Sequence, residues 1–287
     1  MSQCLTELVE LFDMEIIEQG IFRGQSQELH LPQLFGGQVL GQAAKAATLT
    51  VPAFKALHSI HGYFIRAGRA SAPVLYEVTS VHDGRSFSNR QIKASQDGRV
   101  IFSASASFQI AEPGFSHQPE IEQTQQPETC VREIELLNGR SDLAEQVRLR
   151  YSAARAIDIR PVDLIDPSSP HKRAPLKKFW FRADGSLPND PVLHNSVLAY
   201  ASDIGLLITS LLPHGVSDLQ EDMQVASLDH SLRIHCPVKV DDWLLYAMDS
   251  PWAGSGRGLS RGLIYDRSGS LIATVCQEGL IRKHGFS

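Results

Sequence analysis

The surroundings of Asp203 are unusual in this sequence. Between positions 192 and 212, Asp203 is the only Asp, Glu, Lys or Arg. The apolar residues around it recur at helical spacing, which predicts one helix over 192–212 with the carboxylate beside its apolar stripe. A carboxylate in such a helix is costly to bury unless it is paired or hydrogen-bonded. Asp203 is therefore a candidate general base, although a solvated acid on the helix rim or a structural hydrogen bond would also explain it.

Two further polar residues, both on predicted strands, are candidates for the same site. Gln277 continues the face of Leu271, Ala273 and Val275, so its amide should point to the core and needs hydrogen-bond partners there. Ser227 begins a predicted strand over 227–235. A structural hydrogen bond to the backbone explains Gln277 equally well, and a lone serine carries little information by itself.

A carboxylate, an amide and a hydroxyl can together hold one water molecule. If Asp203, Ser227 and Gln277 meet, the carboxylate can take a proton from that water as it attacks an acyl carbon. A thioester is a plausible target because it is more electrophilic than an amide. Backbone N–H groups at a helix N-terminus could stabilise the oxyanion, and Gly36 and Gly37 precede the first predicted helix. A tight strand-to-helix turn is an equally good explanation of these glycines.

Other catalytic signatures are missing from the sequence. It contains no glycine-rich phosphate loop and no His-Glu-x-x-His. The pairs His58/His61 and His230/His235 could in principle bind a metal, but without nearby cysteines or paired carboxylates a structural role is favoured. None of the four cysteines is spaced for a zinc site or a disulfide framework. We therefore expect chemistry without a metal or another cofactor.

The elements that must position these residues occur twice along the chain. Residues 39–45 resemble 197–203, and 61–66 resemble 230–235, so that Lys45 corresponds to Asp203 and His61 to His230. On this alignment, the strand face that carries Gln277 in the second half corresponds in the first half to the face that carries Ser103, Ser105, Ser107 and Gln109. Each unit reads as a strand, one helix and several long strands, which predicts an α+β fold with an antiparallel sheet. Small residues in the first helix, 38–48, would let that sheet curl around it.

The middle of the chain differs in composition from both ends. Seven of the fifteen prolines fall within 112–175, and 112–129 is rich in Pro, Gln and Glu. We predict a first unit over 1–111, a linker over 112–176 with a helical segment near 130–156, and a second unit over 177–287. The second unit would carry the catalytic residues.

Composition and charge exclude several classes of protein. The 287 residues are 43% hydrophobic and 21% charged, which is typical of a globular protein. The net charge of −5 is unsuited to binding nucleic acid. No apolar run approaches the roughly 18 residues of a membrane helix, so no membrane insertion is expected. Acidic residues near the start do not resemble a signal peptide, and we predict a cytoplasmic protein.

These features together resemble the acyl-CoA thioesterase II family. The resemblance rests on FGGQVLGQA at 35–43, HSIHGYF at 58–64, DGRSFS at 83–88 and ASFQ at 106–109 in the first half. In the second half it rests on YASD at 200–203, LDHS at 228–231 and QEG at 277–279. It covers nearly the whole chain and is weakest over 112–176.

The resemblance implies a double-hotdog fold, in which two long helices are each wrapped by an antiparallel sheet. It implies hydrolysis of acyl-CoA to free fatty acid and CoA without a cofactor, by a homo-oligomer. The family's catalytic Asp, Thr and Gln fall on Asp203, Ser227 and Gln277. Serine at 227 keeps the hydroxyl but lacks the β-branch that stiffens χ1. Because Lys45 replaces the carboxylate in the first half, one active site per chain is expected.

Two other functions are compatible with this resemblance. A hotdog enoyl-CoA hydratase or dehydratase would use a catalytic histidine, for which His58, His61 and His230 are candidates. A non-catalytic acyl-CoA-binding protein would use the fold alone. Retention of both Asp203 and Gln277 argues against the binding protein, which needs neither residue.

Overall fold

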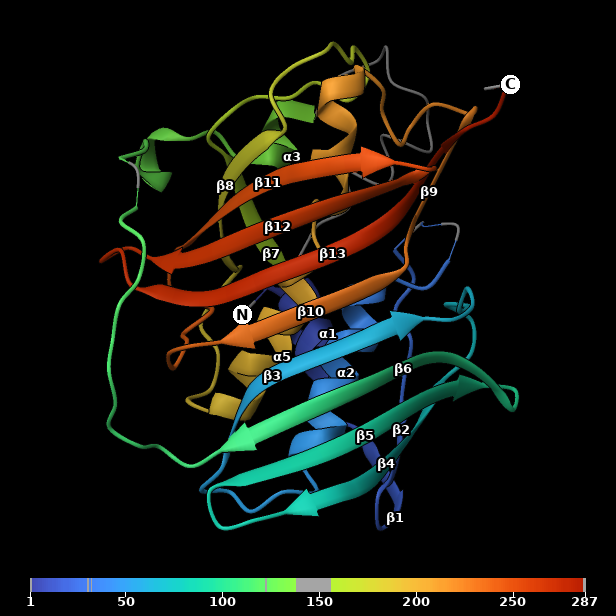
Figure 1. The fold of residues 1–287 in the computed structure, drawn as a ribbon, viewed down its shortest axis with the longest axis vertical. Helices are drawn as coiled ribbons and strands as arrows, with labels where there is room; N and C mark the ends of the chain where they lie inside the picture. The colour runs from blue at the N-terminus through green and yellow to red at the C-terminus, as the bar shows by residue number, and fades with distance from the viewer. Residues whose placement is uncertain (1, 30, 32, 122, 138–155, 286–287) are drawn as a thin grey trace.

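The fold is dominated by one long antiparallel sheet that partly encloses two helices (Figure 1). The structure, a computed structural model, describes residues 2–29, 31, 33–121, 123–137 and 156–285. Of the predicted helical segment 130–156, residues 138–155 lie outside these described residues. The described start of that segment contains one short helix, α3 (Glu133–Leu137).

The first half supplies two helices and one side of the sheet. Its elements are α1 (Gln3–Leu11), β1 (Glu15–Glu18), β2 (Ile21–Gly24), α2 (Gly36–Thr48), β3 (Ala56–Phe64), β4 (Val74–Asp83), β5 (Phe87–Gln96) and β6 (Arg99–Gln109). The predicted first helix is confirmed as α2. Its alanines at 43, 46 and 47 are fully buried against the sheet, as the small-residue pattern indicated.

The second half supplies the other side of the sheet. After η1 (Pro127–Thr129) and α3, its elements are β7 (Ile157–Pro161), β8 (Leu176–Ala183), α5 (Pro191–Ser202), η2 (Leu207–His214), β9 (Met223–Ser227), β10 (Asp229–Ile234), β11 (Leu244–Gly254), β12 (Arg257–Asp266) and β13 (Leu271–Lys283). Figure 1 shows β9 to β13 in orange and red, with β10 beside the blue and green strands of the first half.

The two halves share one strand order. Neighbouring strands follow β2-β4-β5-β6-β3 in the first half and β8-β11-β12-β13-β10 in the second. The halves join where β3 pairs with β10, with His61 opposite Ser231. The predicted duplication is therefore confirmed at the level of topology, while the unit boundaries at 111 and 176 stay predictions.

The alignment of His61 with His230 is wrong by one residue. Opposite residues in a sheet share a face, and the partner of His230 is Gly62, whereas His61 is paired with Ser231. His230 is fully buried on the inner face, while the His61 side chain is 41% exposed. A shift of one residue moves a side chain to the opposite face, so a weak alignment between strands cannot fix the face.

Superposing a bulge that both halves share gives the true correspondence. Between Ser227 and Ser231 the second half has one more residue than the facing stretch of β13, from Gly279 to Cys276. In the first half, β3 has one extra residue between Leu57 and Ser59. Ser227, paired with Gly279, therefore corresponds to Leu57, paired with Phe108. Gln277 lies two residues before Gly279 and so corresponds to Ala106, which lies two residues before Phe108.

The inner face of β6 is consequently not the one that the alignment indicated. Ser103, Ser105, Ser107 and Gln109 are only partly buried or exposed, and the buried residues are those between them. The first half thus presents apolar side chains where the second half presents Gln277.

Helices α2 and α5 pack side by side and run in opposite directions. A Cβ on Gly41 would lie 2.8 Å from the carbonyl oxygen of Ser196, and one on Gly37 would collide with the carbonyl oxygen of Tyr200. The start of α2 therefore lies beside the end of α5, which brings Gly36 and Gly37 close to Asp203.

The helix predicted over 192–212 is interrupted. The α-helix ends at Ser202, Asp203 is its C-cap, and Gly205 adopts a left-handed φ of +70° before η2 begins. Counted as one segment, Pro191–His214 is long and apolar enough to cross a membrane, but 72% of its most apolar window is buried inside the fold. The apolar stripe therefore belongs to the core, and the interruption explains why a carboxylate stands within it.

Candidate active site

The three polar residues singled out in the sequence meet in the structure. The Gln277 Nε2 donates to Asp203 Oδ1 at 2.7 Å and to Ser227 Oγ at 2.7 Å. They come from three elements, because Asp203 caps α5, Ser227 ends β9 and Gln277 lies within β13. Strand register explains the contact between two of them, since Ser227 pairs with Gly279, two residues beyond Gln277 on the same strand.

Burial makes this cluster costly unless it is hydrogen-bonded. Gln277 is fully buried, and the Asp203 side chain is 6% exposed. Nearby, the Tyr246 hydroxyl donates to the backbone carbonyl of Ser202 at 2.7 Å. Burial, with the Asp203 charge adding to it, raises the pKa of Tyr246 well above its usual value, so this hydroxyl keeps its proton. The end of α5 is thus held in one position by a neutral donor.

The directions of these hydrogen bonds leave groups available to a ligand. An ionised carboxylate only accepts, so the Gln277 NH₂ must face Asp203, and its second hydrogen points to Ser227. The Ser227 hydroxyl then accepts from Gln277 and can donate its own hydrogen elsewhere. The buried Gln277 Oε1 has no hydrogen-bond partner among the described residues. One acceptor, one hydroxyl donor and the Asp203 carboxylate can therefore hold a small polar molecule.

The start of α2 faces the same carboxylate. A Cβ on Gly36 would lie 2.8 Å from Asp203 Oδ2 and 2.9 Å from Phe64 Cζ. The N-cap residue, Phe35, makes no side-chain capping bond to this helix. The first N–H groups of a helix have no partner within it and carry partial positive charge. Gly37 also meets a packing need against α5, and the oxyanion role of the glycine pair stays a prediction.

The symmetry-related position in the first half is built differently. Lys45 Nζ lies 4.0 Å from Asp190 Oδ2, and Asp190 is the N-cap of α5. Lys45 thus stands at the start of α5 as Asp203 stands at the start of α2. In the first half, Leu57 and Ala106 occupy the positions of Ser227 and Gln277, and their apolar side chains cannot hydrogen-bond a water molecule.

The histidines are placed unequally. His58 contacts Ser107 Oγ at 2.9 Å, and His61 contacts Asp229 Oδ2 at 2.9 Å on the outer face. Burial lowers the pKa of His58. Among the histidines of the described chain, only His230 lies beside Asp203, with Nδ1 3.6 Å from Oδ1. No sequence pattern favours His230 over the other histidines, apart from its position three residues after Ser227.

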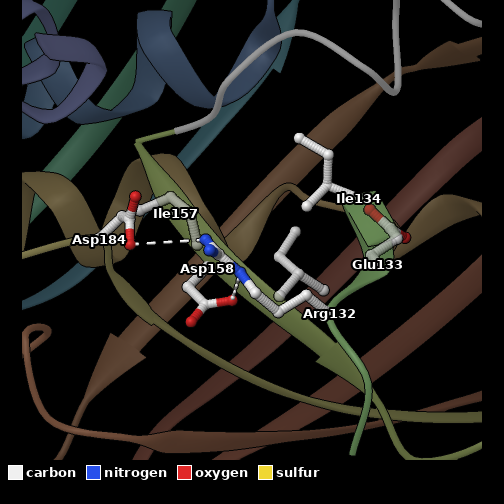
Figure 2. Close-up of a pocket in the computed structure, with 7 residues that line it drawn as sticks. Arg132, Glu133, Ile134, Ile157, Asp158 and Asp184 are labelled. Atoms are coloured by element: carbon white, nitrogen blue, oxygen red, sulfur yellow. Dashed lines mark hydrogen bonds and ion pairs between the residues drawn. The ribbon is translucent and has the colours of Figure 1, made fainter. Parts of the chain in front are cut away.

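Two hollows lie away from this cluster. One of about 160 Å³ is lined in part by Arg132, Asp158 and Asp184, and Figure 2 shows the arginine joined to both carboxylates. Another of about 530 Å³ adjoins Trp243 and Arg267. Neither lining includes any of the five predicted site residues. In the described part of the chain, no three His, Cys, Asp or Glu side chains are grouped to hold a metal ion.

Comparison with known proteins gives the family. A family model described as "Acyl-CoA thioesterase" matches residues 151–280, and one described as "Acyl-CoA thioesterase N-terminal domain" matches residues 29–109. The chain is 39% identical over 283 residues to Acyl-CoA thioesterase 2 of Haemophilus influenzae, covering 98% of this chain and 99% of that protein.

Solved structures agree with the architecture. A crystal structure of an acyl-CoA thioesterase II from Mycobacterium marinum is 38% identical, with a TM-score of 0.79, and the match covers 98% of this chain and 99% of the other. A hot dog fold protein of unknown function from Alicyclobacillus acidocaldarius has a TM-score of 0.78 at 18% identity, over 96% of this chain and 98% of the other. The predicted double-hotdog fold is confirmed. The chain therefore belongs to the acyl-CoA thioesterase II family and is a thioesterase.

Proposed function

We propose that this protein hydrolyses acyl-CoA thioesters to free fatty acid and CoA, with Asp203 as general base. A water molecule held by Asp203, Ser227 and Gln277 attacks the thioester carbonyl carbon, and Asp203 takes one of its protons. The carbonyl oxygen becomes an oxyanion. The carbon–sulfur bond then breaks, the carbonyl re-forms, and the CoA thiolate leaves and is protonated.

One observation carries this proposal. A buried carboxylate, an amide and a hydroxyl are joined by two 2.7 Å hydrogen bonds, while one amide oxygen in the same cluster has no partner among the described residues. Such an arrangement orients a water without a covalent nucleophile. Ser227 contributes its free hydroxyl hydrogen, which is directed by the bond that the hydroxyl accepts from Gln277.

The start of α2 provides the second part of the proposed mechanism. The N–H groups of Gly36 and Gly37 lie at the positive end of a helix that has no side-chain cap from Phe35. They can stabilise negative charge on the thioester oxygen as water attacks. Because Gly36 has no side chain, the reacting carbon can approach both the helix start and Asp203.

A second candidate function, enoyl-CoA hydration or dehydration, is favoured by the contact of His230 with Asp203. A non-catalytic acyl-CoA-binding protein is the third. The decisive experiment incubates the purified chain with saturated and 2-enoyl-CoA substrates over a range of chain lengths. Release of free thiol supports the thioesterase, and loss of the enoyl absorbance without thiol supports the hydratase. Binding without either reaction would identify a non-catalytic acyl-CoA-binding protein.

Metal independence, cytoplasmic location and homo-oligomer formation stay predictions. Thiol release should persist in the presence of a chelator, and activity that disappears with the chelator and returns with zinc would contradict the proposed mechanism. Sedimentation of the purified chain measures its oligomeric state directly.

A further inference from the structure

His230 lies between the helix end that carries Asp203 and the sheet. It is fully buried on the inner face of β10, opposite Gly62. Its Nε2 is 2.9 Å from Ser202 Oγ, and its Nδ1 is 3.6 Å from Asp203 Oδ1. Nδ1 has no hydrogen-bond partner among the described residues, and the Asp203 carboxylate is the charged group close to it.

The hydrogen bonds of Ser202 fix where the ring carries its first proton. Ser202 Oγ also contacts the carbonyl oxygen of Ala199 at 2.8 Å. A carbonyl only accepts, so the hydroxyl hydrogen must point to Ala199, and Ser202 accepts from His230. The ring therefore carries a hydrogen on Nε2.

A neutral ring in this tautomer would face Asp203 with a lone pair. Two electron-rich atoms would then oppose each other in a buried site, where electrostatic interactions are strong. A second hydrogen on Nδ1 makes the same contact attractive. It also supplies the positive charge that a carboxylate with so little access to water requires.

We propose that His230 is a positioning residue, protonated on both nitrogens, which pairs with Asp203 Oδ1 and directs Oδ2 toward the start of α2. This role rests on the proposed function of Asp203 as general base. Its place in the duplication supports it. By the shared bulge His230 corresponds to Ile60, whose partner Ala106 corresponds to Gln277. The histidine thus occurs in the half that has the carboxylate and the amide.

The other titratable groups near the ring are directed elsewhere. Tyr246, on β11, donates to the Ser202 carbonyl. Asp229 precedes His230 on β10 but faces outward and pairs with His61. Cys276, opposite Ser231 on β13, lies on the same outer face, and burial raises the pKa of its thiol. Asp203 is the charged group that the ring meets on the inner face.

Two conservative variants separate the two ring nitrogens. The asparagine amide reaches the position of Nδ1, whereas the glutamine amide reaches that of Nε2. His230→Asn should keep a donor to Asp203, and His230→Gln a donor to Ser202. We expect kcat to fall about tenfold further in His230→Gln than in His230→Asn, with KM changed less than about threefold. Equal kcat values at equal thermal midpoints, or a better glutamine variant, would overturn the positioning role.

Nitrogen-15 NMR of histidine-labelled protein tests the proton itself, without reference to activity. The His230 signal is assigned by its loss in His230→Asn. At neutral pH it should show an imidazolium in the wild type and a neutral ring with hydrogen on Nε2 in Asp203→Asn. A neutral ring in both proteins would overturn the pairing, even if the glutamine variant failed to fold. If the pairing is present but no acyl-CoA is hydrolysed, the proposed function fails and the ion pair stands.

Discussion

Gly36, the first residue of α2, lies directly against the carboxylate of Asp203, the residue that caps α5. A Cβ on Gly36 would be 2.8 Å from Asp203 Oδ2. The two residues come from different halves of a duplicated chain, and they meet because α2 and α5 pack in opposite directions. The candidate site is therefore assembled by both halves, although only the second contributes the carboxylate.

Gly36→Ala should reduce activity much more than stability. The added methyl group would press on Asp203 Oδ2 and on the Phe64 ring, and a displacement of about 1 Å in a catalytic group can cost about 100-fold in rate. The measurement is kcat beside the thermal midpoint. Gly114→Ala is the matched control, since nothing lies within 4 Å of a Cβ there. Equal kcat in the two variants would show that the close approach has no role in turnover.

Ser227→Thr should keep or raise activity, whereas Ser227→Val should lower it. Threonine retains the hydroxyl that accepts from Gln277 and restricts χ1, which should hold the water more firmly. Valine has the same shape as threonine without the hydroxyl, and loss of one hydrogen bond in the transition state corresponds to about tenfold in kcat. If valine performs as well as serine, the hydroxyl does not position water.

Lys45→Ala should leave kcat within about twofold of wild type, because Lys45 contacts Asp190 at the start of α5 and none of the three proposed catalytic residues. Lys45 occupies the position equivalent to Asp203, but its neighbours by register are apolar. Thiol release by this variant under saturating acyl-CoA is the measurement. A loss as large as that caused by removing the Asp203 carboxylate would mean that both symmetry-related positions are catalytic.

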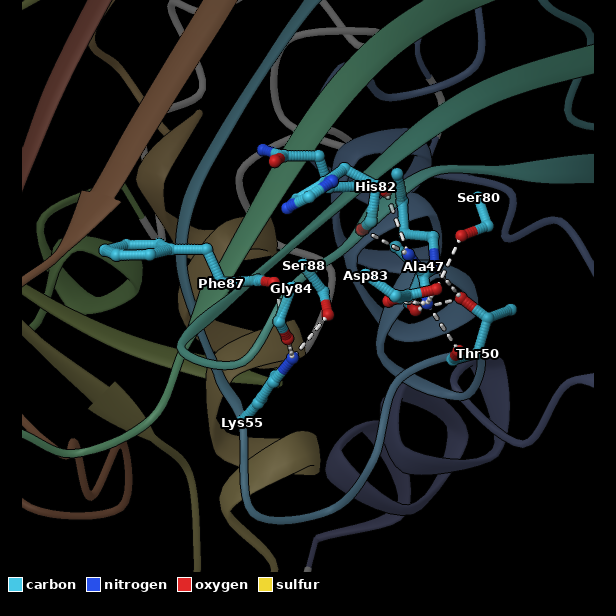
Figure 3. Close-up of polar contacts among 11 residues, drawn as sticks. Ala47, Thr50, Lys55, Ser80, His82, Asp83, Gly84, Phe87 and Ser88 are labelled. Carbon is cyan, nitrogen blue, oxygen red and sulfur yellow. Dashed lines mark hydrogen bonds and ion pairs between the residues drawn. The ribbon is translucent and has the colours of Figure 1, made fainter.

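Asp83→Asn should make the thermal midpoint of the protein less dependent on pH in the acidic range. Hydrogen bonds from Ser80, Ser88 and Arg90 hold the pKa of Asp83 well below its usual range, and Figure 3 shows Asp83 among these polar contacts. A carboxyl whose pKa is lower in the folded state stabilises it above the unfolded pKa, and this contribution disappears as pH falls. The difference in thermal midpoint between wild type and variant should be largest at neutral pH and shrink below about pH 4. A constant difference would contradict this.

The sequence was sufficient to single out Asp203 and Gln277 because each violates a local pattern, whereas the choice of Ser227 rested on the family resemblance. Asp203 is the only charge in its apolar segment, and Gln277 occupies a core-facing position of an alternating strand. Such violations are visible without knowledge of the fold. The helix break after Ser202 was missed because the apolar spacing continues past Gly205, although the backbone there turns to a left-handed φ of +70°.

The faces of paired strands could not be predicted in the same way. One extra residue in a strand moves every later side chain to the opposite face of the sheet. Neither bulge is marked in the sequence as clearly as a turn is marked by glycine. The alignment therefore placed His61 with His230, on opposite faces. For the same reason the contact of His230 with Asp203 emerged only from the register of β10 with β3 and β13.

Replacement of the Asp203 carboxylate tests the account most directly. Asn has nearly the same shape and can still accept from Gln277, but it cannot take a proton from water. The measurement is kcat for thiol release by Asp203→Asn beside its thermal midpoint and its affinity for acyl-CoA. We expect kcat to fall by about 10²–10⁴-fold, with the fold and substrate binding retained. A folded Asp203→Asn protein with near-normal kcat would make Asp203 structural and contradict the proposed mechanism.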